Sequence, residues 1–380
     1  MYDYAEDNRS WERFEDQIQS VTISRYITTV GKNAFSGCEK LTSVEIADSV
    51  KTIGERAFYS CINLKPVTIP DGVTTIENEA FRYCKALIDI AIPASVATVG
   101  DYVFANCNNL KTVSFSDGYA KIGVGMFYQC EKLETITIPD SVTTIEKYAF
   151  YSCKAIKNIS IPDGVTSIEA NTFAYCINIE NIIIPDSVTS IGDSAFYYCI
   201  KLKSITIPDS VTTIGEYAFN DCDSLTSVTV PAGVETIGNY AFRDCNKLNG
   251  IYVDENNANY SSDENGVLYN KDKTELIQYP NGKTEVSYTI PGSVTSVNGG
   301  AFYNNDYIRS LTIPDNVKNI GERAFAECSN LVSVTIGNGV ETIGEYAFCR
   351  CEKLANLTIG SKVKSIGNEA FRNCNNYFIS

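Results

Sequence analysis

Cysteine is the residue type in this chain with the widest range of chemistry, as a nucleophile, metal ligand or disulfide partner. The sequence of 380 residues contains fourteen cysteines and no histidine. Without histidine, Cys-His and Ser-His-Asp nucleophile systems and histidine zinc sites are excluded. Thirteen of the cysteines stand three residues after a phenylalanine, mostly 23 residues apart: Cys38, Cys61, Cys84, Cys107, Cys130, Cys153, Cys176, Cys199, Cys222, Cys245, Cys328, Cys351 and Cys374.

This column of thiols predicts packing rather than catalysis. If each 23-residue segment is one coil of a stack, neighbouring positions lie about 5 Å apart. That separation suits a disulfide, but side chains stacked in register point in parallel, and a linear column cannot surround a zinc ion. We therefore expect buried, reduced thiols that fill space like small apolar side chains. Cys349 is out of phase, one residue after Phe348, and we expect it to be exposed.

Acidic side chains form a second column, in the turn that follows a predicted strand. Five of these aspartates occur in consecutive segments and three lie outside that run: Asp117, Asp140, Asp163, Asp186 and Asp209, then Asp48, Asp71 and Asp315. Stacked carboxylates could attract Ca²⁺, but aspartate is also a favoured turn residue. The oxygen-rich stretches 254–257 and 263–266 lack the spacing of a calcium loop. We favour solvated turns and a polar, mobile loop, and predict no metal site, no cofactor and no catalytic residue.

Tyrosines give the most useful surface signal. They follow the repeated phenylalanine by one or two positions, or precede it by two, and the densest run is Tyr128, Tyr151, Tyr175, Tyr197 and Tyr198. Tyrosine offers a large rigid contact area with a polar tip, which suits a binding surface. The alternative is an aromatic ladder in which each ring packs on its neighbour. We take these five residues as candidates for partner binding. A column of Thr and Ser in the strands predicts a face that is unsuited to strong binding.

The elements that position these columns follow from the phenylalanines. Fourteen of them stand 23 residues apart with one interruption: Phe35, Phe58, Phe81, Phe104, Phe127, Phe150, Phe173, Phe196, Phe219, Phe242, Phe302, Phe325, Phe348 and Phe371. A fixed period of this length indicates one supersecondary unit stacked many times, with a core formed only between neighbours. The sequence therefore predicts a repeat solenoid of about fifteen coils.

One segment, residues 199–221, serves to predict the course of a coil. Ile205 and Ile207 flank Thr206 as in a short half-buried strand, and Pro208 begins a turn. A second, shorter extended segment follows at 211–214, and residues 216–222 suit one short helical or 3₁₀ turn, with Phe219 filling the centre. Strands of successive coils should pair in parallel, including the pair Val67 and Ile69.

The interruption predicts an enlarged coil. From Cys245 to Gly282, the next residue in cysteine phase, is 37 residues, which is 14 more than the period, and residues 266–280 resemble a β-hairpin around a polar turn. The predicted organisation is an N-terminal cap at 1–14, repeat coils at 15–244, the enlarged coil with its hairpin at 245–281, further coils at 282–373 and a C-terminal cap at 374–380 in which Tyr377, Phe378 and Ile379 cover the last coil.

The repeating unit C-x-x-L-x-x-V-x-I-P-x-x-V-x-x-I-G-x-x-A-F resembles the BspA-like leucine-rich repeats of surface proteins from host-associated bacteria and some parasitic protists. More than ten near-identical copies occur in phase. The insert GVLYNKDKTELIQYP resembles a variant coil of that family, and MYDY followed by SWERF resembles the tail of its usual cap. The resemblance implies a right-handed, curved leucine-rich repeat superhelix, export, and a role in adhesion without catalytic residues. Asn305 departs from the pattern at a cysteine position, and leucine-rich repeats tolerate that exchange because either side chain can bond nearby backbone.

Composition limits the possible partners. A formal charge of −15 and a pI near 4.6 argue against nucleic acid and anionic membrane surfaces. No run reaches the 18 apolar residues of a membrane span, and we expect export with the signal peptide absent from this sequence. We predict a monomeric, non-enzymatic recognition module, secreted or on the cell surface, that binds a protein such as a host matrix or surface protein. The alternative is a glycan-binding platform, because rows of tyrosine also suit sugar rings.

Overall fold

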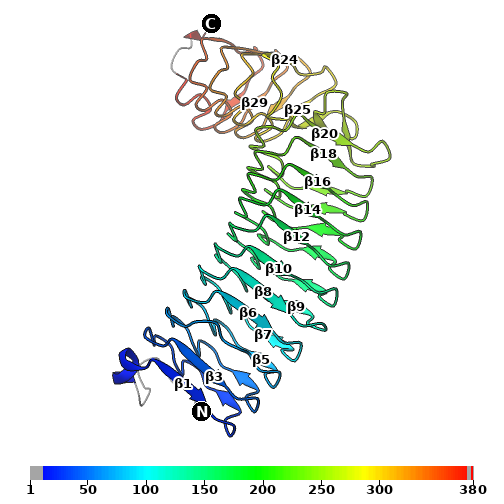
Figure 1. The fold of residues 1–380 in the computed structure, drawn as a ribbon. Helices are drawn as coiled ribbons and strands as arrows, with labels where there is room; N and C mark the ends of the chain where they lie inside the picture. Colours follow the sequence, from blue (N-terminus) through cyan, green and yellow to red (C-terminus); the bar gives the residue numbers. More distant parts are fainter. Residues whose placement is uncertain (1–11, 375–377, 380) are drawn as a thin grey trace. The chain divides into compact units, whose positions relative to one another are not determined.

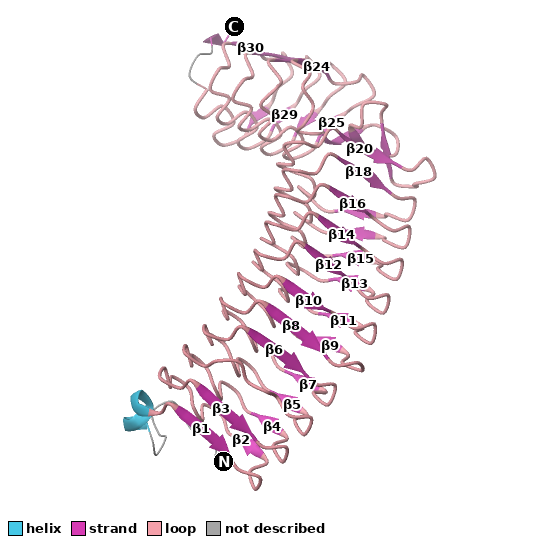
Figure 2. Ribbon diagram, in the orientation of Figure 1, coloured by secondary structure: helices cyan, strands magenta, loops and turns pink. Residues whose placement is uncertain are grey.

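The computed structural model describes the backbone of residues 12–374 and 378–379. Its contacts divide the chain into two compact units, Met1–Leu202 and Lys203–Ser380, which are described separately. Within each unit, coils of 23 residues are stacked so that equivalent short strands lie side by side (Figure 1). Figure 2 shows strands joined by loops along the coils, and the one helix among the described residues is the short 3₁₀ helix η1 (Glu12–Gln17). A parallel β-solenoid built from the predicted period is therefore confirmed.

Unit 1 contains two series of strands. The first series is β1 (Ser20–Ile23), β3 (Ser43–Ile46), β6 (Asp89–Ile92), β8 (Thr112–Phe115), β10 (Thr135–Thr137), β12 (Asn158–Ser160) and β14 (Asn181–Ile183). The second is β2 (Thr29–Val30), β4 (Thr52–Ile53), β5 (Thr75–Ile76), β7 (Thr98–Val99), β9 (Lys121–Ile122), β11 (Thr144–Ile145), β13 (Ser167–Ile168) and β15 (Ser190–Ile191). Pairing is parallel with a shift of one repeat, as for Val21 with Val44 and Ile90 with Val113.

One predicted strand of unit 1 is missing. Val67 and Ile69 are buried as expected, but the backbone around them forms no strand between β3 and β6. Pro66 directly precedes Val67, and proline has no amide hydrogen to donate to a ladder. The apolar pattern therefore identified the buried side chains correctly but overestimated the hydrogen bonding.

Unit 2 also contains two series of strands, with the enlarged coil among them. Its first series is β16 (Ser204–Thr206), β18 (Ser227–Val230), β20 (Gly250–Val253), β24 (Ser287–Thr289), β26 (Ser310–Ile313), β28 (Ser333–Ile336), β30 (Asn356–Thr358) and β32 (Phe378–Ile379). The second is β17 (Thr213–Ile214), β19 (Thr236–Ile237), β25 (Ser296–Val297), β27 (Asn319–Ile320), β29 (Thr342–Ile343) and β31 (Ser365–Ile366). The pairing of β32 with β30 adds a short strand at the sheet edge. Most of both predicted caps lies outside the described residues.

The insert of unit 2 is ordered. The predicted hairpin is confirmed as β22 (Leu268–Asn270) antiparallel to β23 (Glu275–Gln278), and a third strand, β21 (Tyr260–Ser262), extends it. Asp254 Oδ1 accepts the amide of Asn256, and Asp263 Oδ1 accepts the amides of Asn265 and Val267. These carboxylates fix turns, so the prediction of a mobile loop has no support in this bonding.

The segment around each repeated phenylalanine is not the predicted helical or 3₁₀ turn. In each regular coil the residues two before and two after the phenylalanine have positive φ, as at Tyr148 (61°) and Ser152 (59°). This alternation breaks a helical pattern. In the coil of Phe35, the amides of Asn33, Phe35 and Gly37 donate to carbonyls of the next coil, over N···O distances of 2.7–2.8 Å. We call these three repeating bonds the turn ladder. Its bonds offset the cost of about 1 kcal/mol of each left-handed residue.

The phenylalanines and cysteines form the core of each unit. Rings stack on the equivalent ring of the next coil, with centroids 5.2 Å apart for Phe58 and Phe81 and 5.6 Å for Phe150 and Phe173. In unit 2, Tyr279 takes the phenylalanine position of the enlarged coil and stacks on Phe302. Most of these side chains pack against their counterparts in the adjacent coils, which is why a single coil cannot form the core alone.

Candidate functional site

The five candidate tyrosines of unit 1 are brought together on one surface. They come from the turn segments of consecutive coils, where Tyr175 and Tyr198 occupy left-handed positions, with φ of 61° and 60°. Because the turn ladder fixes the backbone of each coil at the same height, side chains at equivalent positions meet their counterparts one coil away. We call the set Tyr128, Tyr151, Tyr175, Tyr197 and Tyr198 the tyrosine surface.

Ring contacts run through the tyrosine surface without a gap. Tyr128 stacks on Tyr151 with centroids 4.7 Å apart and planes at 8°, and Tyr151 lies 5.3 Å from Tyr175. Tyr175 then lies 5.2 Å from Tyr197 and 5.3 Å from Tyr198. The geometry is that of the aromatic ladder weighed from the sequence, and it leaves open whether the same rings also bind a partner.

Burial of these rings is partial. Tyr128, Tyr151, Tyr175 and Tyr197 are half-buried, and Tyr198 is exposed at 39% of its surface. Burial, followed by the proximity of Tyr175 and Tyr128, raises the pKa of Tyr151 to about 12. Tyr151 is therefore neutral at physiological pH. The tyrosine surface combines apolar ring area with phenol groups, as binding surfaces often do.

Arginines extend the aromatic surface in a way that the sequence did not indicate. The guanidinium of Arg82 lies 5.0 Å from the ring centroid of Tyr83 and 5.6 Å from that of Tyr102. Glu79 pairs with both Arg56 and Arg82. Burial raises the pKa of Glu79, but the hydrogen bonds to the two arginines lower it more, so that the pKa lies below its usual value. The signal was available, since Arg56 and Arg82 occupy turn columns that hold tyrosine in other coils.

The strand face is less uniform than its Thr and Ser column predicts. In β14, Ile183 stands in that column and is exposed at 75% of its surface. In unit 2, Tyr252 of β20 occupies the same column and is exposed at 43%. Comparison of that column coil by coil would have found both residues.

The thiol prediction is confirmed for the repeated column, in which all thirteen cysteines are free and buried. Most of these thiols donate to the carbonyl of a phenylalanine one coil back, as in Cys84 Sγ to Phe58 O at 3.2 Å. Burial raises the pKa of Cys84 well above its usual value. Cys349 is free but only partly exposed, less than predicted.

Asn305 is buried, and its Oδ1 accepts the amides of Tyr307 and Ile308. The bonding expected at this exchange is therefore confirmed.

Two features are absent from the described residues, 12–374 and 378–379. No group of three or more acidic or cysteine side chains is arranged to hold a metal ion there. No helix in that part of the chain is long and apolar enough to cross a membrane.

Comparison with known proteins finds the same type of repeat in bacterial leucine-rich repeat proteins. The family model described as BspA type leucine rich repeat region matches residues 12–123, 74–203, 120–249, 166–288 and 279–379. A leucine rich cell surface protein from Faecalibacterium prausnitzii is 29% identical, with 83% of this chain and 87% of that chain covered and a TM-score of 0.62. A leucine-rich repeat protein from Bacteroides ovatus is 28% identical, with 94% and 77% covered and a TM-score of 0.55. Comparison with curated proteins gave no match.

Proposed function

The chain belongs to the BspA type leucine rich repeat family, and we propose that it is a non-enzymatic recognition module, secreted or held at the cell surface, that binds a protein partner. The surface location is supported by the similar Faecalibacterium prausnitzii protein, which is a cell surface protein. The non-enzymatic role is supported by the thiols, the most reactive side chains of the repeat. The thirteen thiols of the repeated column are buried, and most of them bond phenylalanine carbonyls.

The observation that carries protein binding is the continuity of the tyrosine surface. Five partly exposed rings contact one another over four consecutive coils, from Tyr128 to Tyr198. Rings held rigidly by neighbours lose little side-chain entropy when a partner docks. A partner that covers several coils would therefore find a wide, preorganised aromatic strip, in which a few desolvated rings can supply most of the binding energy.

A glycan is less well suited to the same surface. A sugar that stacks on tyrosine needs an open ring face, but Tyr128 and Tyr151 stack nearly in parallel, at 8° and 4.7 Å, and so cover one face of each other. Tyr175 is enclosed on two sides by Tyr151 and Tyr197. Ring edges and phenol groups are what such a surface offers, and these suit the mixed chemistry of a protein partner.

The test is binding to an immobilised panel of extracellular matrix proteins, with a glycan array in parallel. Replacement of Tyr151, Tyr175 and Tyr198 by Ser should weaken binding to the matrix protein at least about tenfold, or about 1.4 kcal/mol. The matched control replaces Thr137, Thr206 and Thr229 of the strand face by Ser, and it should bind like the parent protein. Binding to glycans alone, with the tyrosine variant unaffected, would refute the proposal.

Since the rings also pack on one another, the triple variant could lose its fold. Tyr198→Ser alone separates the two effects, because this ring is the most exposed of the five and lies beside Tyr175 and Tyr197. We expect several-fold weaker binding with an unchanged melting temperature. Normal binding by a folded Tyr198→Ser and a folded triple variant would move the contact elsewhere, first to the hairpin at 269–274.

A further inference from the structure

The turn ladder of unit 2 is broken at the enlarged coil. One coil earlier it is intact, since Tyr217, Phe219 and Asp221 donate their amides to the carbonyls of Asn239, Ala241 and Arg243. The equivalent amides of the next coil belong to Tyr240, Phe242 and Asp244. Among residues 12–374 and 378–379, none of these three has a hydrogen-bond acceptor. Three backbone donors that most regular coils bond to the next coil are thus left available.

The backbone of the enlarged coil explains the break. Its positions two before and two after the aromatic Tyr279 are Ile277 and Asn281, and neither has the positive φ that the regular coils show there. Ile277 instead belongs to β23, which pairs with β22 and with β25. The carbonyls of an extended strand point alternately to its two neighbouring strands, here β22 and β25, so they do not meet the turn segment of the preceding coil.

Gln278 replaces the small residue that precedes the aromatic ring in regular coils, such as Ala241 and Ala301. Its side chain is buried, with 5% of its surface exposed, and its Nε2 donates to the carbonyls of Tyr279 and Ala301, at 3.1 and 3.2 Å. The amide group is therefore held in place by its nitrogen. Its Oε1 has no partner in the described part of the chain, so a fixed acceptor is presented at the break.

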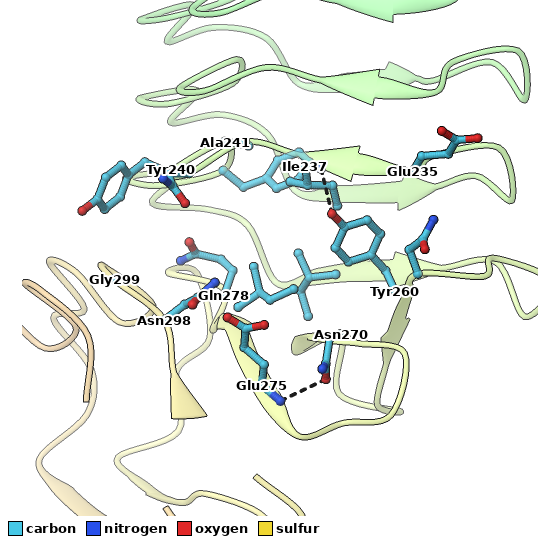
Figure 3. A pocket seen from close by; sticks show the side chains of 16 residues that line it. Glu235, Ile237, Tyr240, Ala241, Tyr260, Asn270, Glu275, Gln278, Asn298 and Gly299 are labelled. Atoms are coloured by element: carbon cyan, nitrogen blue, oxygen red, sulfur yellow. Dashed lines mark hydrogen bonds between the residues drawn. The ribbon is translucent and has the colours of Figure 1, made fainter. Parts of the chain in front are cut away.

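These groups border a cavity of about 390 Å³, within the usual size range of small-ligand sites. Figure 3 shows Tyr240, Gln278 and Asn298 on one side of it, Tyr260 and Asn270 on the other, and Glu275 between them. The hydroxyl oxygen of Tyr260 accepts the amide of Ile237 at 2.9 Å, where a regular coil would supply a carbonyl. The hydroxyl hydrogen of Tyr260 remains to donate elsewhere. Leu268 and Ile277 add apolar lining.

The charges of the residues that line the cavity indicate which class of ligand it can bind. The cavity is lined by two carboxylates, Glu235 and Glu275, and by no lysine or arginine. An anion would meet these carboxylates without a compensating cation, so phosphate, sulfate and acidic sugars are disfavoured. Backbone donors, amide and carboxylate acceptors and tyrosine hydroxyls lie around a partly apolar surface. A molecule with many hydroxyl groups and an apolar ring face matches that mixture.

We propose that this cavity, the insert pocket, binds one residue of a neutral saccharide. The amides of Tyr240 and Phe242 donate to sugar oxygens, and Gln278 Oε1 and Glu275 accept sugar hydroxyls. The inference is independent of the tyrosine surface, since it rests on groups of the enlarged coil and its neighbours within unit 2.

The test is ligand-observed NMR and calorimetry with glucose, galactose, mannose and N-acetylglucosamine, and with N-acetylneuraminic acid as the acidic comparison. We expect at least one neutral sugar to bind with a Kd of about 1 mM or tighter, and the acidic sugar to bind at least about tenfold more weakly. Gln278→Ala, which restores the residue of the regular coils, should weaken binding at least fivefold.

A second variant guards against a folding defect in Gln278→Ala. Asn239 has an exposed side chain that borders the cavity, so Asn239→Trp should fill the cavity mouth and abolish binding with the fold intact. Its control is Glu345→Trp, at the equivalent position of a regular coil, which should bind sugar normally. The proposal is overturned if no neutral sugar binds, if the acidic sugar binds as well, or if Asn239→Trp binds like the parent protein.

Discussion

Regular coils and the enlarged coil treat the same backbone groups in opposite ways. In the coils that hold the tyrosine surface, the backbone amides beside the phenylalanines are hydrogen-bonded in the turn ladder, as for the amide of Phe150, which donates to the carbonyl of Thr172. Only side chains are then left for recognition. At the enlarged coil of unit 2 the ladder stops, and Tyr240 and Phe242, whose amides have no acceptor among the described residues, line a cavity. A repeat protein can therefore build two kinds of site, one from side chains on an unbroken ladder and one from backbone where it breaks.

The largest expected effect tests the unbroken region. Phe196 is fully buried and stacks on Phe173 at 5.5 Å. Phe196→Ala should open a cavity and lower the free energy of unfolding by about 3–5 kcal/mol. Phe242→Ala, at the break, should cost less, because Phe242 already borders the insert pocket. Chemical denaturation measures both, and a loss below about 1 kcal/mol for Phe196→Ala would show that the core column is misidentified.

The next effect tests how the structure recovers after the break. In regular coils a cysteine thiol donates to the carbonyl of the repeated aromatic residue one coil back, and a cysteine at position 305 would reach Tyr279 in this way. The carbonyl of Tyr279 is already bonded by Gln278, and position 305 holds asparagine instead of cysteine. Asn305→Ala leaves the amides of Tyr307 and Ile308 without their acceptor, so we expect a loss of about 2–4 kcal/mol. Asn305→Cys restores the repeat and should cost about 1 kcal/mol or less. Equal losses for the two variants in denaturant unfolding would show that the asparagine bonds contribute little.

The sequence predicted what depends on side-chain period and failed where backbone bonding decides. The spacing of phenylalanines gave the coils, and the phase of the cysteines gave their burial. Tyr148 and Arg56 were not expected to adopt positive φ, because neither residue type favours it and only bonds to the next coil stabilise it. The insert pocket was missed for the same reason. The pocket arises from the extended backbone at Ile277, which the pattern of side chains does not predict.

A smaller effect separates the cysteine column from its exception. Cys349 is the one cysteine of the described chain that is not fully buried, and burial raises its pKa although Arg350 and Arg372 lower it. We expect it to react with a thiol reagent at least about tenfold faster than the other thirteen, at a rate that rises with pH as the thiolate forms. Mass spectrometry of partly labelled protein identifies the site. Guanidinium should release all fourteen thiols without a reductant, and intramolecular disulfides in that sample would contradict the buried-thiol column.

The smallest effect concerns the tyrosine surface at high pH. The pKa of Tyr151 is raised from 10 to about 12 in the folded protein, chiefly by burial. Because the folded state disfavours the phenolate, this contribution to stability is fully present below about pH 10 and is lost as the pH rises toward 12. Tyr151→Phe removes the titrating group, so its melting temperature should fall less steeply than that of the parent protein between pH 10 and pH 12. Tyr26→Phe, at an exposed ring outside the ladder, is the control and should follow the parent curve. If Tyr151→Phe follows it as well, the ring contacts do not hold Tyr151 away from water, and the ladder is looser than the 4.7 Å stacking with Tyr128 implies.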